Sequence, residues 1–161
     1  MHEALISYFT GEKQGGLWFL GTGIVALAIG GWVCRHPAWY RAILYPLLIV
    51  GMIQAGAGLV LQLRTNSQAA RLEKQLFENP AEYKAGELSR LEKTMLGFRV
   101  FKVCWLLMIA AGVFLAYRSP AESPRLAVGI GLIAQGAAML VLDLFAESRA
   151  QIYAEAIREM G

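Results

Sequence analysis

Apolar residues along the chain gather in four blocks, each about as long as a membrane-spanning helix. The blocks lie at residues 17–34, 42–63, 97–117 and 126–146. A hydrocarbon core of about 30 Å requires about 20 apolar residues of helix. Strands of a membrane barrel would instead be about 10 residues long with strict alternation. The pattern predicts an all-α fold, an integral membrane four-helix bundle that forms a single domain over residues 1–161.

The segment 64–96 between the second and third blocks is predicted to be helical. Apolar residues fall near helical spacing after Arg64, so the second helix should continue to about Glu78. Asn79 followed by Pro80 then predicts a stop and a new start, with Asn79 as N-cap and Pro80 at the first helical position. The new helix should run into the third span. Ser123 followed by Pro124 predicts the same kind of start for the fourth helix.

The two ends of the chain also carry helical patterns. Residues 147–161 extend the fourth helix, because apolar side chains recur there at every fourth position: Ile152, Ala156 and Met160. Three of the four helices are therefore expected to extend beyond the membrane as a small bundle. Their apolar stripes would pack on one another or, alternatively, dock a partner. Residues 2–9 predict a short interfacial helix with three side chains in lipid: Leu5, Ile6 and Phe9.

Composition and charge narrow the class of protein. The chain is 57% hydrophobic and 17% charged, whereas a soluble domain is about 45–50% apolar and 25% charged. An ordinary soluble enzyme, a disordered chain and a nucleic-acid-binding domain are therefore excluded. Of the 15 Lys and Arg residues, 11 lie on the side of the termini and residues 64–102, and 4 lie in the two short loops. This bias predicts a multi-pass inner-membrane protein with both termini in the cytoplasm.

The two halves of the chain resemble each other weakly. The sequence from Leu59 to Leu63 resembles that from Leu140 to Leu144, and Gln54 corresponds to Gln135, all at an offset of 81 residues. Either the chain contains two tandem helical hairpins, or the similarity reflects the chance alignment of apolar helices.

The candidates for polar contacts within the predicted spans are five residues: Gln54, Gln135, Asp143, Lys102 and Arg99. Both glutamines lie near mid-bilayer depth, where a side-chain amide should face the protein interior, and we expect them to hydrogen-bond to each other or to nearby backbone. Asp143 is expected to form a salt bridge with Lys102 or Arg99. The alternative is a proton or cation site.

The remaining chemistry is sparse, and no catalytic, metal-binding or cofactor-binding constellation stands out. Cys34 and Cys104 lie 70 residues apart in different spans, with no metal-ligand spacing. We expect a non-catalytic binding role with the bilayer and another membrane protein as partners, such as an immunity-type partner of a membrane-acting toxin. The alternative is a homo-oligomeric channel or transporter that uses Gln54, Gln135 and Asp143. A third possibility is an accessory subunit that carries a lipid or quinone.

Overall fold

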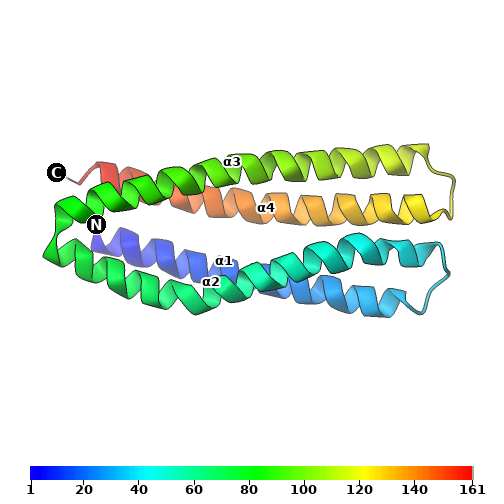
Figure 1. The fold of residues 1–161 in the computed structure, drawn as a ribbon, viewed down its shortest axis with the longest axis horizontal. Helices are drawn as coiled ribbons and strands as arrows, with labels where there is room; N and C mark the ends of the chain where they lie inside the picture. Colours follow the sequence, from blue (N-terminus) through cyan, green and yellow to red (C-terminus); the bar gives the residue numbers. More distant parts are fainter. Residues whose placement is uncertain (161) are drawn as a thin grey trace.

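The computed structural model describes residues 1–160, and within them the chain forms four long helices and one 3-10 turn (Figure 1). The elements are α1 (His2–Val33), η1 (Tyr40–Ile43), α2 (Leu44–Glu78), α3 (Pro80–Arg118) and α4 (Pro124–Arg158). The predicted all-α fold is confirmed. Each long helix is also long and apolar enough to cross a membrane. At 1.5 Å per residue they are about 48–58 Å long, so each exceeds a hydrocarbon core of about 30 Å.

The helices form two antiparallel hairpins that lie side by side, α1 with α2 and α3 with α4 (Figure 1). Both termini and the α2–α3 junction lie at one end, which we call the terminal end. The connections at residues 34–43 and 119–123 lie at the other, the loop end. Helix α4 joins the hairpins, because it packs on α1, α2 and η1 as well as on α3. Gly131 allows this approach, since a Cβ there would lie 2.5 Å from Pro46 Cγ.

The predicted capping signals define the start of both helices in the second hairpin. Asn79 Oδ1 accepts a hydrogen bond from the backbone N–H of Glu82 at 3.3 Å, and Asn79 Nδ2 donates to Glu82 Oε2 at 3.0 Å. Ser123 Oγ likewise accepts from the N–H of Leu126 at 3.2 Å. Each cap is followed by proline at the start of the helix, where a missing N–H leaves no unpaired donor. Both predictions are confirmed.

Glycines bring the two helices of each hairpin into close contact. In the first hairpin, a Cβ on Gly23 would lie 2.7 Å from the carbonyl oxygen of Gly51. In the second hairpin, a Cβ on Gly112 would lie 2.7 Å from the carbonyl oxygen of Gly129. Small residues permit such backbone approach between apolar helices. Gly129 follows Gly51 by 78 residues rather than 81, so these contacts do not share the offset of the sequence similarity, and the repeat remains a prediction.

All four helices meet in an apolar core at the terminal end. Its buried residues include Leu5 and Phe9 of α1, Leu76 of α2, Leu91 of α3 and Tyr153 of α4. The small bundle at this end therefore includes α1 as well as the three helices expected to form it. Residues 2–9 are the first turns of α1 rather than a separate interfacial helix. Leu5 and Phe9 are buried in this four-helix core, and of the three only Ile6 is exposed.

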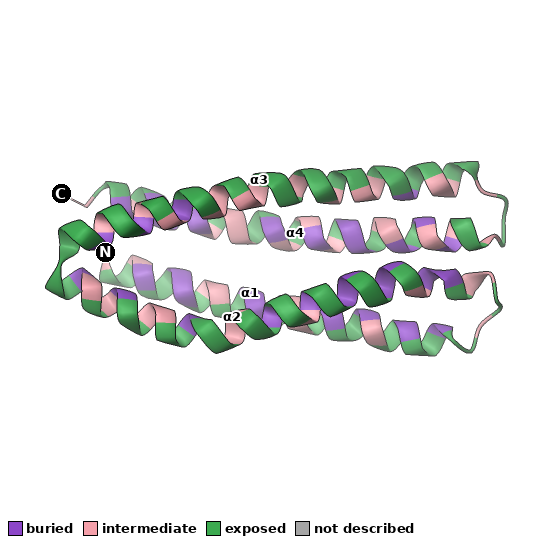
Figure 2. Ribbon diagram, viewed as in Figure 1, coloured by how far each residue is buried: buried purple, intermediate pink, exposed green. Residues whose placement is uncertain are grey.

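The loop-end part of α3 has the most exposed apolar surface in the bundle (Figure 2). Only 6% of its most apolar window is buried, against 33–39% for the other three helices. Its large exposed side chains include Val103, Leu107, Val113 and Phe114. Helix α3 is thus held mainly by α4 along this part of its length.

Candidate functional site

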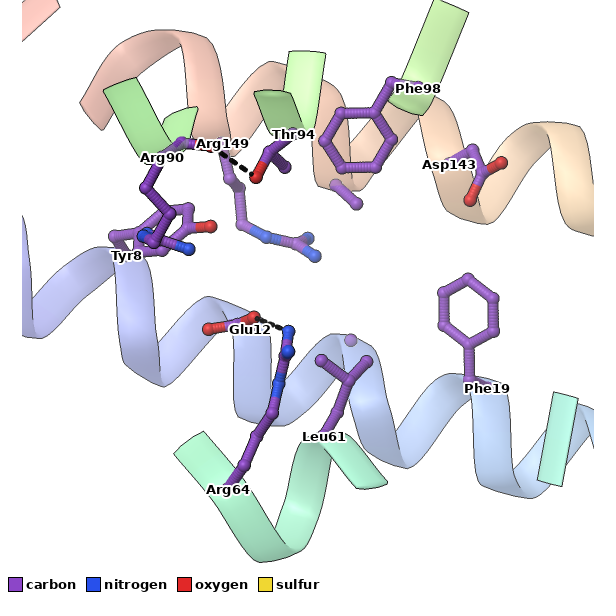
Figure 3. Close-up of a pocket in the computed structure, with 12 residues that line it drawn as sticks. Tyr8, Glu12, Phe19, Leu61, Arg64, Arg90, Thr94, Phe98, Asp143 and Arg149 are labelled. Carbon is purple, nitrogen blue, oxygen red and sulfur yellow. Dashed lines mark hydrogen bonds and ion pairs between the residues drawn. The ribbon is translucent and has the colours of Figure 1, made fainter. Parts of the chain in front are cut away.

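A cavity of about 200 Å³ lies between the hairpins, next to the terminal-end core. Figure 3 shows side chains from all four helices pointing toward it. Three arginines and two acids line it together with apolar side chains: Tyr8, Glu12, Gly15, Phe19, Leu61, Arg64, Arg90, Thr94, Phe98, Asp143, Ala146 and Arg149. Five charged groups in one cavity of an otherwise apolar bundle make it the strongest candidate for a site.

Arg64 and Glu12 form an ion pair across the first hairpin. Arg64 Nη2 donates to Glu12 Oε1 at 3.2 Å, and the Glu12 side chain is 13% exposed. The other carboxylate oxygen, Glu12 Oε2, is buried and has no hydrogen-bond partner among residues 1–160. A carboxylate oxygen can only accept hydrogen bonds, so Glu12 Oε2 is an unsatisfied acceptor enclosed by the protein.

Arg90 is held by its own helix and by two aromatic rings of α1. Its Nε and Nη2 donate to the two carboxylate oxygens of Glu87 at 2.9 and 2.6 Å. The guanidinium carbon lies 5.7 Å from the ring centre of Tyr8 and 5.9 Å from that of Phe9. Burial alone would lower the pKa of Arg90, but the hydrogen bonds and the charge of Glu87, together with Tyr8, outweigh it and raise the pKa. This arginine is therefore fixed and its charge is neutralised.

Arg149 differs, because it enters the same cavity without an acidic partner. Its side chain crosses α1 over two glycines: a Cβ at Gly11 would lie 2.6 Å from Arg149 Cδ, and one at Gly15 would lie 2.7 Å from Nη2. Among residues 1–160, no carboxylate oxygen lies within 4.0 Å of its guanidinium. Burial lowers the pKa of Arg149, with Tyr8 and Glu12 opposing that effect. The guanidinium is thus placed to bind an added acidic group.

Asp143 lines the cavity from α4, but its partner is not the one that the sequence predicts. Its Oδ2 accepts a hydrogen bond from Trp105 Nε1 at 2.5 Å. Lys102 instead pairs with Glu147, at 2.6 Å, and Arg99 lies at a different, exposed cavity between α3 and α4. The predicted salt bridge is therefore wrong, because Glu147, one turn farther along α4, takes Lys102.

The two glutamines are both buried, yet they do not bond to each other. Neither side-chain polar atom of Gln54 has a hydrogen-bond partner within the described chain, and neither does Nε2 of Gln135. Gln135 lines a groove between α1 and α4, whereas Gln54 lies inside the bundle with no exposed surface. The predicted hydrogen bond between the two glutamines is therefore wrong, and so is the alternative of a bond to nearby backbone for Gln54 and for Nε2 of Gln135.

The most informative cavity residues were not among the sequence candidates. Glu12 and Arg149 lie outside the predicted spans, where charge is expected on a solvated surface. The α1 side of the cavity nevertheless has a readable pattern, because Tyr8, Glu12, Gly15 and Phe19 recur at helical spacing. Glu12 and Gly15 on this otherwise aromatic face of the helix are the sequence signal from which the cavity could be predicted.

The arrangement is suited to holding a ligand in a fixed orientation. Each carboxylate already has one partner: Glu12 has Arg64, Glu87 has Arg90 and Asp143 has Trp105. Across residues 1–160, no three His, Cys, Asp or Glu side chains are grouped so as to hold a metal ion.

Comparison of the chain with protein-family models, with curated proteins and with solved structures finds no match.

Proposed function

We propose that this chain is a non-catalytic binding protein of a bacterial-type inner membrane, with its ligand in the arginine-lined cavity. Four helices of membrane-spanning length and composition support the membrane assignment. The excess of Lys and Arg at the terminal end supports a cytoplasmic location for both termini. The cavity then lies at the cytoplasmic surface of the bilayer.

The observation that carries the proposal is the guanidinium of Arg149. It borders a cavity of about 200 Å³ and has no acidic partner, while Arg64 and Arg90 are both paired. Leaving a partly buried charge unpaired opposes folding. A bound acidic group would supply the missing hydrogen bonds, and charge-assisted bonds of this kind are the strong ones. The favoured ligand therefore carries an acidic group that reaches Arg149.

Photo-crosslinking in native membranes tests this site. A genetically encoded diazirine amino acid is placed at Leu61, which lines the cavity, and as a matched control at Leu63, which is 74% exposed on the same helix. We expect one dominant adduct at Leu61 that disappears in Arg149→Gln, and a mixed set at Leu63. Identical adducts at both positions, unaffected by Arg149→Gln, would refute the proposal.

Labelling of the natural cysteines tests the orientation. In a Cys104→Ser variant the sole cysteine is Cys34, which is exposed at the loop end. A membrane-impermeant maleimide should label it in intact spheroplasts. Labelling only in inside-out vesicles would place the cavity on the opposite side of the membrane.

A protein partner is a second candidate, favoured by the exposed apolar surface of α3. A membrane helix of such a partner would pack against side chains such as Val113 and Phe114. In this case the chain would be the immunity-type protein and the partner a membrane-inserting toxin. A photo-crosslinker at Phe114 should then give one protein adduct of defined mass, or a dimer of this chain in a homo-oligomer. Lipid adducts alone would remove this candidate.

The channel alternative has less support. Asp143 borders the arginine-lined cavity, and Gln135 borders the groove between α1 and α4. Gln54 borders neither of these spaces. A transport pathway would bring such groups into one continuous passage.

A further inference from the structure

The size of the arginine-lined cavity restricts its occupant to a small molecule. Its volume is about 200 Å³, below the roughly 300–1,000 Å³ of pockets that take drug-sized ligands. An apolar cavity of about 150 Å³ holds one benzene molecule. In the same proportion, this cavity has room for about eight non-hydrogen atoms. A whole phospholipid or a nucleotide is therefore too large for it.

Two hydrogen-bond donors of the cavity are free to bind such a molecule. Figure 3 shows the Arg149 guanidinium pointing into the cavity, with the Tyr8 hydroxyl close to the same side chain. Within residues 1–160 the guanidinium makes no hydrogen bond. Its nitrogens are nevertheless not among the buried side-chain atoms that lack a partner, so a ligand can reach them. The Tyr8 hydroxyl interacts with Arg90, which can only donate, so its own hydrogen stays available.

The fixed charges favour a ligand with a single negative charge. Each of the other two arginines is already paired with a glutamate. Arg149 therefore supplies the only unpaired positive charge among the lining residues within 1–160. Asp143 lines the same cavity, and its hydrogen-bond partner, Trp105, is neutral. A dianion would bring a second negative charge that meets no cation and is repelled by Asp143.

The part of the cavity that the guanidinium faces is apolar. Its walls include Phe19, Leu61, Phe98 and Ala146, and Figure 3 shows the two phenylalanine rings on either side of the open space. In the described chain neither ring packs against another aromatic side chain. Both rings thus retain apolar surface, and covering it with hydrocarbon is favourable by about 25 cal/mol per Å².

We propose that the cavity binds a small monocarboxylate with an apolar body of about six carbons, a molecule of the size of benzoate or hexanoate. Its carboxylate accepts hydrogen bonds from the Arg149 guanidinium and the Tyr8 hydroxyl, and its hydrocarbon lies against Phe19 and Phe98. A planar carboxylate can accept two parallel bonds from one guanidinium. This inference rests on the proposed function and names the class of its ligand.

Fluorine NMR of the full-length protein in dodecyl maltoside, dialysed free of small acids, tests the assignment. The probe is 4-fluorobenzoate, and saturable line broadening reports its binding. Benzoate and hexanoate should displace it. Benzamide, which has the shape of benzoate without the charge, should compete about tenfold or more weakly, the factor expected for one charge-assisted hydrogen bond. Phenyl phosphate, a dianion at about pH 8, should also compete more weakly than benzoate.

Paired variants separate the charge of the site from its space. Arg149→Gln should abolish saturable binding, and Arg149→Lys should retain part of it, because lysine keeps the charge but not the fork of donors. Arg71→Gln, on an exposed arginine of α2, should leave binding unchanged. Leu61→Trp should block the probe by occupying the cavity, whereas Leu63→Trp, at a position 74% exposed on the same helix, should not.

The absence of saturable binding overturns this inference, and so does binding that Arg149→Gln leaves unchanged. Phenyl phosphate that binds more tightly than benzoate overturns it as well, and the wild-type titration alone decides that point. If Leu61 gives an Arg149-dependent adduct of another acid in native membranes, the proposed function stands and only the monocarboxylate assignment fails. If no such adduct forms, both fail.

Discussion

Gly58 of α2 is the position where one added methyl group tests the packing of the first hairpin most directly. In Gly58→Ala the Cβ would lie 2.5 Å from the backbone nitrogen of Leu20 and 2.6 Å from the carbonyl oxygen of Gly16. Both are backbone atoms, so no side-chain rotation relieves the contact. Gly56 provides the matched control on the same helix, since no atom lies within 4 Å of a Cβ placed there.

The geometry sets the size of the effect. A contact of 2.5 Å must open by about 0.9 Å to reach the 3.4 Å at which ordinary van der Waals contact begins. Overpacking that forces backbone shifts costs about 1–3 kcal/mol. Both variants gain the same helix propensity, about 1 kcal/mol for Gly to Ala. The difference between their free energies of unfolding therefore isolates the packing term, and Gly58→Ala should be the less stable by about 1–3 kcal/mol.

Reversible unfolding in mixed micelles measures this difference. Wild type, Gly58→Ala and Gly56→Ala are titrated with sodium dodecyl sulfate in dodecyl maltoside, with tryptophan fluorescence as the signal. Gly56→Ala should be as stable as wild type or more so. If the two variants differ by less than about 0.5 kcal/mol, the range of ordinary surface substitutions, the close approach of α1 and α2 does not hold the hairpin.

Three further predictions concern the terminal end and the α3–α4 loop. The buried hydroxyls of Tyr83 and Tyr153 lie 2.6 Å apart, and burial is the main cause that raises the pKa of each. The folded state keeps protons that the unfolded chain releases, so the free energy of unfolding should fall as pH rises above about 10. In a double variant with phenylalanine at both positions, pH-dependent denaturation should show a shallower fall. Asn79→Ala should lower the free energy of unfolding by about 1 kcal/mol through the lost N-cap; an unchanged unfolding midpoint would contradict that role. Glu122 has φ of 60°, so Glu122→Gly should raise the free energy of unfolding by up to about 1 kcal/mol, and thermal unfolding that shows a lower melting temperature would contradict the strain.

Local signals account for the parts of the fold that the sequence predicts. The cap at Asn79 depends on residues within one turn of it, and so does the cap at Ser123. The helices are specified by continuous apolar blocks that need no knowledge of neighbours. The predictions of these features are correct because the residues that interact to form them lie close together along the chain.

The partners of the polar residues depend on how far neighbouring helices are shifted along each other, and the sequence pattern does not specify this shift. Depth in the membrane is predictable from position, so Asp143 and Lys102 were expected at similar levels. The axial position of α4 against α3 instead places Glu147 beside Lys102 and leaves Asp143 to Trp105. A shift of one helical turn is enough to exchange the partners.

The cavity itself arises from three-dimensional packing that the sequence pattern does not express. In the sequence, Arg149 is one of the basic residues whose bias predicts a cytoplasmic C-terminus. In the structure its side chain lies over Gly11 and Gly15 of α1, which precede it by more than 130 residues. The glycines that make room for it read as ordinary small residues of a membrane helix. Only the packing of α4 against α1 shows that these glycines make room for an arginine at the edge of the cavity.

The central claim is that Arg149 binds a group supplied from outside the chain. Electron cryomicroscopy of the protein in native-lipid nanodiscs, with a bound antibody fragment to add mass, would resolve its surroundings. The account predicts density for a bound acidic group in the cavity, within hydrogen-bond distance of the Arg149 guanidinium. A direct ion pair between Arg149 and Asp143 or Glu12, with side chains filling the cavity, would contradict it.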